Sequence, residues 1–111
     1  MRLDRNLDGN MKRGKYAILN LRKLIACESS DGLPAHLKDA ISHLEVAGVL
    51  EWGCAGDPDE FFLVKLKDVY SRPALLAYAH AAAADDPEWA NEVNGLAERS
   101  GRNHQLCKRP D

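Results

Sequence analysis

The seven residues from Gly9 to Lys15 read GNMKRGK and match the GxxxxGK pattern of a phosphate-binding P-loop. That chemistry needs an apolar strand before the loop, a helix after it, and a Ser or Thr beside the lysine for magnesium. Here the preceding residues are polar, a strand pattern follows, and Tyr16 stands at the hydroxyl position. Two interpretations therefore remain: a basic turn without a ligand, or a turn whose glycine backbone and basic side chains bind an anion.

Histidine, carboxylate and thiol side chains form two further groups typical of metal or nucleophile chemistry. His36, Asp39 and His43 share one face of a predicted helix, but the two histidines lie two turns, about 10 Å, apart. One metal ion does not readily bind both. His104 and Cys107 resemble a base and a nucleophile, yet the polar tail offers no third group to orient them. We therefore expect no catalytic residues, no metal and no cofactor, and a protein that is not an enzyme.

Charge is distributed unevenly along the 111 residues, whose net charge is -2. Residues 1–25 hold seven basic and two acidic side chains (+5), residues 26–99 hold five and fourteen (-9), and residues 100–111 hold three and one (+2). This distribution predicts either an N-terminal segment that binds an anionic partner, or charge complementarity between that segment and the acidic body.

The basic side chains crowded around Gly14 indicate which residues of the N-terminal segment would bind an anionic partner. An anionic partner would relieve the mutual repulsion of like charges held close together. The ring of Tyr16 would stack on a base or a guanidinium from the same strand face as Arg22. The predicted binding residues are Arg5, Lys12, Arg13, Lys15, Tyr16 and Arg22.

Hydrophobic periodicity predicts three strands and three helices. Alternation over residues 16–24 and 61–67 and a short apolar run over 49–52 favour strands, the last two joined as a hairpin through a Gly56-Asp57-Pro58 turn. Helical spacing predicts a helix between Pro34 and Gly48 and a second from Ser71 to about Ala84.

A third helix follows the N-cap Asp86, with Trp89, Val93 and Leu96 on its apolar stripe and Gly101 at its end. The order β-α-β-β-α-α predicts an α+β fold, a three-stranded antiparallel sheet with helices packed on one face. We expect a single domain over residues 1–111, with a polar basic N-terminal arm (about 1–14) and a polar C-terminal tail (about 103–111).

The composition of the chain indicates in which cellular compartment we expect the protein. The chain is 45% hydrophobic and 29% charged, which excludes a disordered chain, and no apolar run approaches the ~18 residues of a membrane span. The N-terminus has no apolar signal-peptide region. Three cysteines, with no CxxC pair, predict reduced thiols: Cys27, Cys54 and Cys107. We expect a cytoplasmic protein that does not bind membranes.

The passage from Leu44 to Leu50, LEVAGVL, resembles the transition from recognition helix to wing in winged-helix proteins. That resemblance implies a nucleic-acid-binding regulator. The helix carries Lys38 against Asp39 and Glu45, which makes it a poor face for DNA, and a good helix stop before a buried strand would look the same. Nucleic-acid binding is therefore the alternative function.

Four passages together, GKYAILNLRKL, EFFLVKLKD, DDPEWA and CKRPD, resemble a family of small uncharacterised accessory proteins of tailed phages and prophages. The resemblance implies a non-enzymatic protein that acts by stoichiometric binding in counter-defence or host takeover, in the host cytoplasm. Its partner would be a host protein complex, as for an inhibitor of a defence complex, or an anionic nucleotide signal, as for a sponge. A nucleic acid and a second copy of the chain stay open as further partners.

Overall fold

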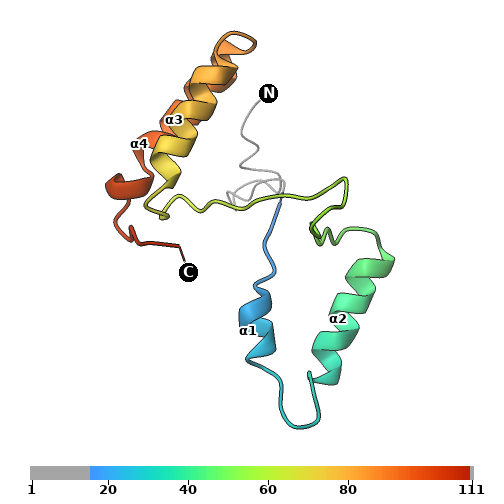
Figure 1. The fold of residues 1–111 in the computed structure, drawn as a ribbon. Helices are drawn as coiled ribbons and strands as arrows, with labels where there is room; N and C mark the ends of the chain where they lie inside the picture. Colours follow the sequence, from blue (N-terminus) through green and yellow to red (C-terminus); the bar gives the residue numbers. More distant parts are fainter. Residues whose placement is uncertain (1–15, 111) are drawn as a thin grey trace, which may run out of the picture. The chain divides into compact units, whose positions relative to one another are not determined.

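The computed structural model of this chain describes residues 16–110. Its elements are the helices α1 (Leu21–Ile25), α2 (Ala35–Val46), α3 (Ser71–Ala82) and α4 (Pro87–Glu98), and the short 3-10 helix η1 (Gly101–Asn103) (Figure 1). These residues divide into two compact units. The first consists of Tyr16 and residues 63–110, and the second is Ala17–Phe62.

The predicted α+β fold with a three-stranded antiparallel sheet is wrong, because residues 16–110 contain helices and no strand. Residues 16–20 lack regular structure, and at Leu21 the chain enters α1. The Asn20 side chain caps that helix, its Oδ1 accepting from the backbone N of Lys23 at 3.0 Å. Capping by asparagine thus begins a helix where the apolar alternation predicted a continuing strand.

The predicted hairpin is also wrong. Residues 49–52 and 61–64 lie in irregular chain, so the wing that a winged-helix interpretation requires is not formed. The turn between them is confirmed: the Asp57 N donates to Cys54 O at 3.1 Å and the Glu60 N to Asp57 O at 3.0 Å. The Phe61 ring lies so close to Gly53 that any side chain at Gly53 would collide with it. A local loop therefore forms in place of the predicted pairing of two strands, because alternation of apolar and polar residues does not by itself produce strand pairing.

All three predicted longer helices are confirmed. Ala35–Val46 begins directly after Pro34 and ends before Gly48, whose φ of 73° suits glycine. Ser71–Ala82 stops two residues before its predicted end. Pro87–Glu98 begins as the sequence predicts, with the Asp86 Oδ1 accepting from the Trp89 N at 3.0 Å.

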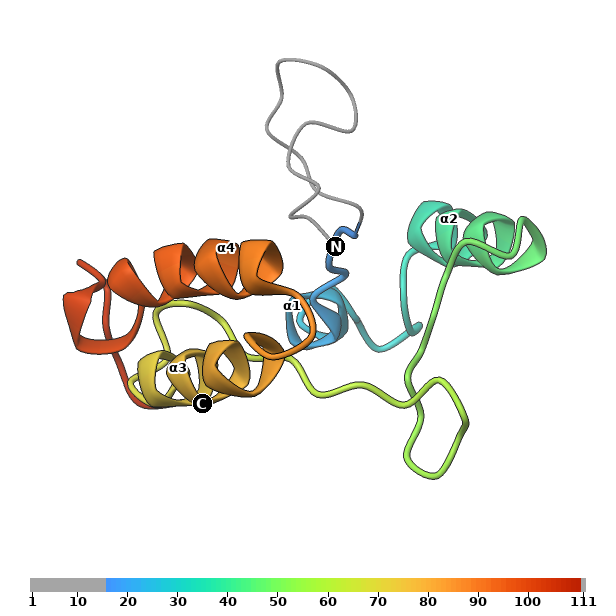
Figure 2. The same ribbon diagram turned by 90° about the horizontal axis from the view of Figure 1, so that it is seen from above.

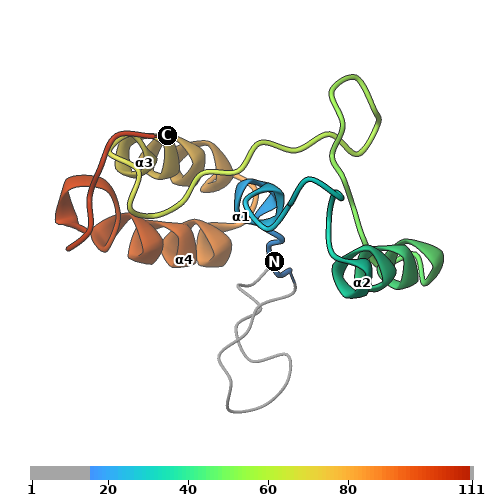
Figure 3. The same cartoon turned by 90° about the horizontal axis from the view of Figure 1, so that it is seen from below.

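The first unit is a helical hairpin of α3 and α4, which lie side by side in both Figure 2 and Figure 3. Its core consists of Ala79, Ala90 and Val93, with Leu75 and Trp89 among the partly buried residues packed against it. Small side chains at this contact allow the two helices to approach closely. The Trp89 ring meets Tyr78 edge-on, with centroids 6.5 Å apart, and its Nε1 donates to the Tyr78 hydroxyl at 3.2 Å.

The second unit differs in that neither α1 nor α2 contains a buried residue. Large apolar side chains within it are exposed instead, including Val46 (90%), Trp52 (44%) and Phe62 (91%). Its 46 residues hold eight acidic and three basic side chains. The packed core of the described chain therefore lies in the first unit, and so does the site described next.

Candidate functional site

Ser71, the first residue of α3, fastens together two segments that are 30 residues apart in the chain. Its side chain is fully buried. The hydroxyl lies 2.8 Å from Leu66 O and 2.7 Å from Asp68 O, to which it donates, and it accepts from the Gly101 N at 3.0 Å. The Gly101 N also donates to Leu66 O at 2.7 Å. The chain entering α3 is thereby fixed against the chain leaving α4.

The segment after α4 then runs along the chain that precedes α3. The Val69 N donates to Lys108 O, and the Lys108 N donates to Lys67 O, each at 2.9 Å. These two bonds form an isolated parallel bridge between Asp68 and Lys108. Backbone hydrogen bonds thus hold the polar C-terminal tail in one position.

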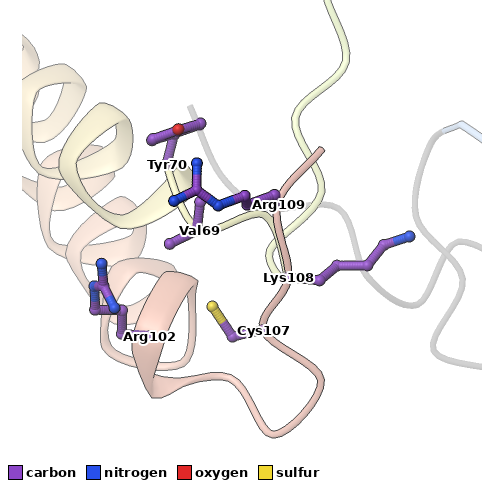
Figure 4. Close-up of a pocket in the computed structure, with 6 residues that line it drawn as sticks. All are labelled: Val69, Tyr70, Arg102, Cys107, Lys108 and Arg109. Atoms are coloured by element: carbon purple, nitrogen blue, oxygen red, sulfur yellow. The ribbon is translucent and has the colours of Figure 1, made fainter. Parts of the chain in front are cut away.

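A hollow of about 260 Å³ lies where these segments meet (Figure 4). We call it the basic hollow, and its lining residues are Val69, Tyr70, Arg102, Cys107, Lys108 and Arg109. Three of the six are basic, and none of the lining residues is acidic. In Figure 4 the Arg109 side chain extends toward Tyr70, whereas that of Lys108 extends away from the other five.

The nearest acidic residue in sequence, Asp68, is already engaged. Its Oδ1 accepts from the backbone N of Tyr70 at 2.8 Å, and it does not line the hollow. Two guanidinium groups, each with several N–H donors in one plane, suit carboxylate or phosphate oxygens. The arrangement can therefore bind an anionic group.

The thiol of Cys107 belongs to the same hollow and is half-buried. His104, the histidine that the sequence analysis considered beside Cys107 and set aside, makes a local bond: its Nδ1 accepts from the backbone N of Leu106 at 3.0 Å. That bond leaves only Nε2 to carry the proton of a neutral ring. The Nδ1 of His104 is therefore not available as a base for the Cys107 thiol. All three cysteines are unpaired thiols.

Four of the six sequence-predicted binding residues, Arg5, Lys12, Arg13 and Lys15, lie outside the described residues. Tyr16 is 70% exposed and belongs to the first unit, whereas Arg22 is an exposed residue of α1 in the second unit. The prediction that Tyr16 and Arg22 share one strand face is wrong, because Arg22 is helical. The role of these six residues stays a prediction.

Sequence reasoning missed the basic hollow. The charge count of residues 100–111 was a signal, since Arg102, Lys108 and Arg109 give that segment its +2. The site was missed because residues 103–111 were interpreted as a polar tail. The buried Ser71 and the positive φ of Gly101 (58°), which fold it back, have no distinctive pattern in the sequence.

Within residues 16–110, no three or more His, Cys, Asp or Glu side chains gather where they could hold a metal ion.

In the same part of the chain, no helix has the length and apolar character needed to cross a membrane.

Comparison with protein families, with curated proteins and with solved structures finds no match to this chain. The geometry of the basic hollow therefore carries the functional argument alone.

Proposed function

We propose that this protein acts by stoichiometric binding and that the basic hollow receives an anionic group of its partner. The observation that carries the proposal is that Arg102 and Arg109 both line one hollow, and that no acidic side chain lines it among residues 16–110. The Ser71 hydroxyl, which accepts from the Gly101 N, and the backbone hydrogen bonds of Lys108 fix the walls, so little ordering is needed on binding. Anionic ligands are favoured here because the guanidinium groups offer charge-assisted hydrogen bonds.

The resemblance to phage accessory proteins suggests the biological setting of such binding. In that setting the partner would be an anionic nucleotide signal that is sequestered, or an acidic surface of a host defence complex that is blocked. Nucleic-acid binding is less favoured, because the wing on which that alternative rested is not formed. Each of these anionic partners would bind to the same two arginines of the hollow, Arg102 and Arg109.

Isothermal titration calorimetry with inorganic pyrophosphate, in low-salt buffer, tests the proposal. The full chain should bind the probe, and the double variant Arg102→Ser/Arg109→Ser should bind it at least about tenfold more weakly, a difference of about 1.4 kcal/mol. Higher salt should weaken binding, because the charges are partly exposed.

The matched control is Arg99→Ser, which removes an arginine of the same unit that does not line the hollow. Within residues 16–110, the Arg99 side chain donates to Gly95 O of α4, at 3.4 Å. Its variant should bind pyrophosphate within about twofold of wild type, since exposed charges outside a site contribute little. No binding by wild type, or equal weakening by control and double variant, would overturn the proposal.

A further inference from the structure

The lining of the basic hollow includes an aromatic ring that binding of a bare anion does not use. Tyr70 precedes α3 directly and its side chain is 55% exposed. Two hydrogen bonds fix the backbone at and just before Tyr70: the Tyr70 N donates to Asp68 Oδ1 at 2.8 Å, and the neighbouring Val69 N donates to Lys108 O. A tyrosine ring held at a basic site without being buried offers its face to a ligand.

The Tyr70 ring and the basic side chains line the same hollow. Both Tyr70 and Arg109 line the hollow, and Figure 4 shows the Arg109 side chain extending toward the Tyr70 ring. An aromatic face binds a planar heteroaromatic base by stacking, and an arginine binds phosphate oxygens in a planar fork. A nucleotide is the ligand class that contains both groups at a short, fixed separation.

The size of the hollow indicates how much of a ligand it can hold. Its volume of about 260 Å³ lies just below the ~300–1,000 Å³ usual for small-molecule sites. One nucleotide, partly inserted, matches this size better than a dinucleotide. Val69 adds an apolar contact beside the ring.

From the juxtaposition of Tyr70 with Arg102 and Arg109, we infer that the basic hollow binds a single nucleotide, with the base on Tyr70 and the phosphates on the two arginines. This inference rests on the proposed function and adds the class of ligand. It predicts that the base increases affinity beyond the phosphates, and that this increase depends on Tyr70 alone.

The test compares four probes by calorimetry on the full chain: ADP, pyrophosphate, adenosine and a thymidine hexanucleotide. Wild type should bind ADP about tenfold more tightly than pyrophosphate, within the range of base stacking on an aromatic side chain. Tyr70→Leu should lose this advantage and keep its affinity for pyrophosphate. Tyr70→Phe, which keeps the ring, should keep the advantage, and adenosine alone should bind weakly.

The other possible results of this calorimetry distinguish failure of the nucleotide inference from failure of the anion-binding proposal. If pyrophosphate and ADP bind equally, or if Tyr70→Leu keeps the advantage of ADP, the nucleotide inference fails and the anion-binding proposal survives. If pyrophosphate does not bind to wild type at all, the anion-binding proposal fails. If the hexanucleotide binds more tightly than ADP, the ligand is a nucleic-acid strand, and the inference of a single nucleotide is overturned.

Discussion

Gly101 is the residue on which the basic hollow depends most directly, since the chain turns there from α4 toward the tail. Its φ of 58° lies in the left-handed region, and a Cβ added to it would lie 2.8 Å from the Arg72 Cβ. Its N also meets Leu66 O and the Ser71 hydroxyl. Backbone conformation and steric space both favour glycine at this position, and the two hydrogen bonds of its N hold the turn in place.

We predict that Gly101→Ala lowers the free energy of unfolding by more than 2 kcal/mol, combining about 1–2 kcal/mol of backbone strain with a collision against Arg72. Urea denaturation followed by circular dichroism gives the measurement. The control is Gly56→Ala, because Gly56 has a similar φ of 85° but no atom within 4 Å of an added Cβ. Equal losses in the two variants would show that the space around Gly101 is not limiting.

At the scale of elements, the hairpin of α3 and α4 gives the first unit its core, and Trp89 lies at the edge of that core. We predict that Trp89→Ala destabilises the protein by about 3 kcal/mol, the low end for aromatic truncation, because the ring is only partly buried. The thermal midpoint should fall by several degrees. Trp52→Ala, which truncates an exposed tryptophan of the second unit, is the matched control and should change the midpoint little. A Trp89→Ala midpoint equal to that of wild type would contradict the docking of α4 through this ring.

The elements also show what the sequence could and could not predict. The longer helices were predictable because their signals are local: Asp86 with Pro87 at one start, Pro34 at another, and Gly48 at a stop. The strands were not, because a strand exists only when another chain segment pairs with it. Residues 16–24 show the point, since Asn20 caps a helix in the middle of an alternating run. The hollow depends on contacts between residues 30 to 41 positions apart, which hydrophobic periodicity does not report.

At the scale of the whole molecule, the two units differ in how they are stabilised. Residues 63–110 contain every buried residue of the described chain, whereas α1 and α2 bury none. A helix of 12 residues without a buried face is marginal in water. We predict that amides of α3 and α4 exchange with deuterium at least about tenfold more slowly than those of α2, because exchange from α2 needs only local opening. Mass spectrometry of peptides from the full chain gives the rates, and equal protection would contradict the difference.

The units also differ in charge, and this places the anion site. The second unit holds eight acidic and three basic side chains, a surface that repels anions. Residues 63–110 are nearly balanced, with seven basic and six acidic side chains, and three of the basic ones line one hollow. We therefore place anion binding in residues 63–110 because of the local arrangement of their basic side chains rather than because of their net charge.

The most direct test of that location is a two-dimensional amide NMR titration of the full chain with pyrophosphate. We predict that the largest shifts fall on residues 68–70 and 102–109, with little change in α2. Shifts concentrated between Arg5 and Arg22, with the amides of Val69, Tyr70 and Arg102 unmoved, would contradict the account and place the anion at the N-terminal segment instead.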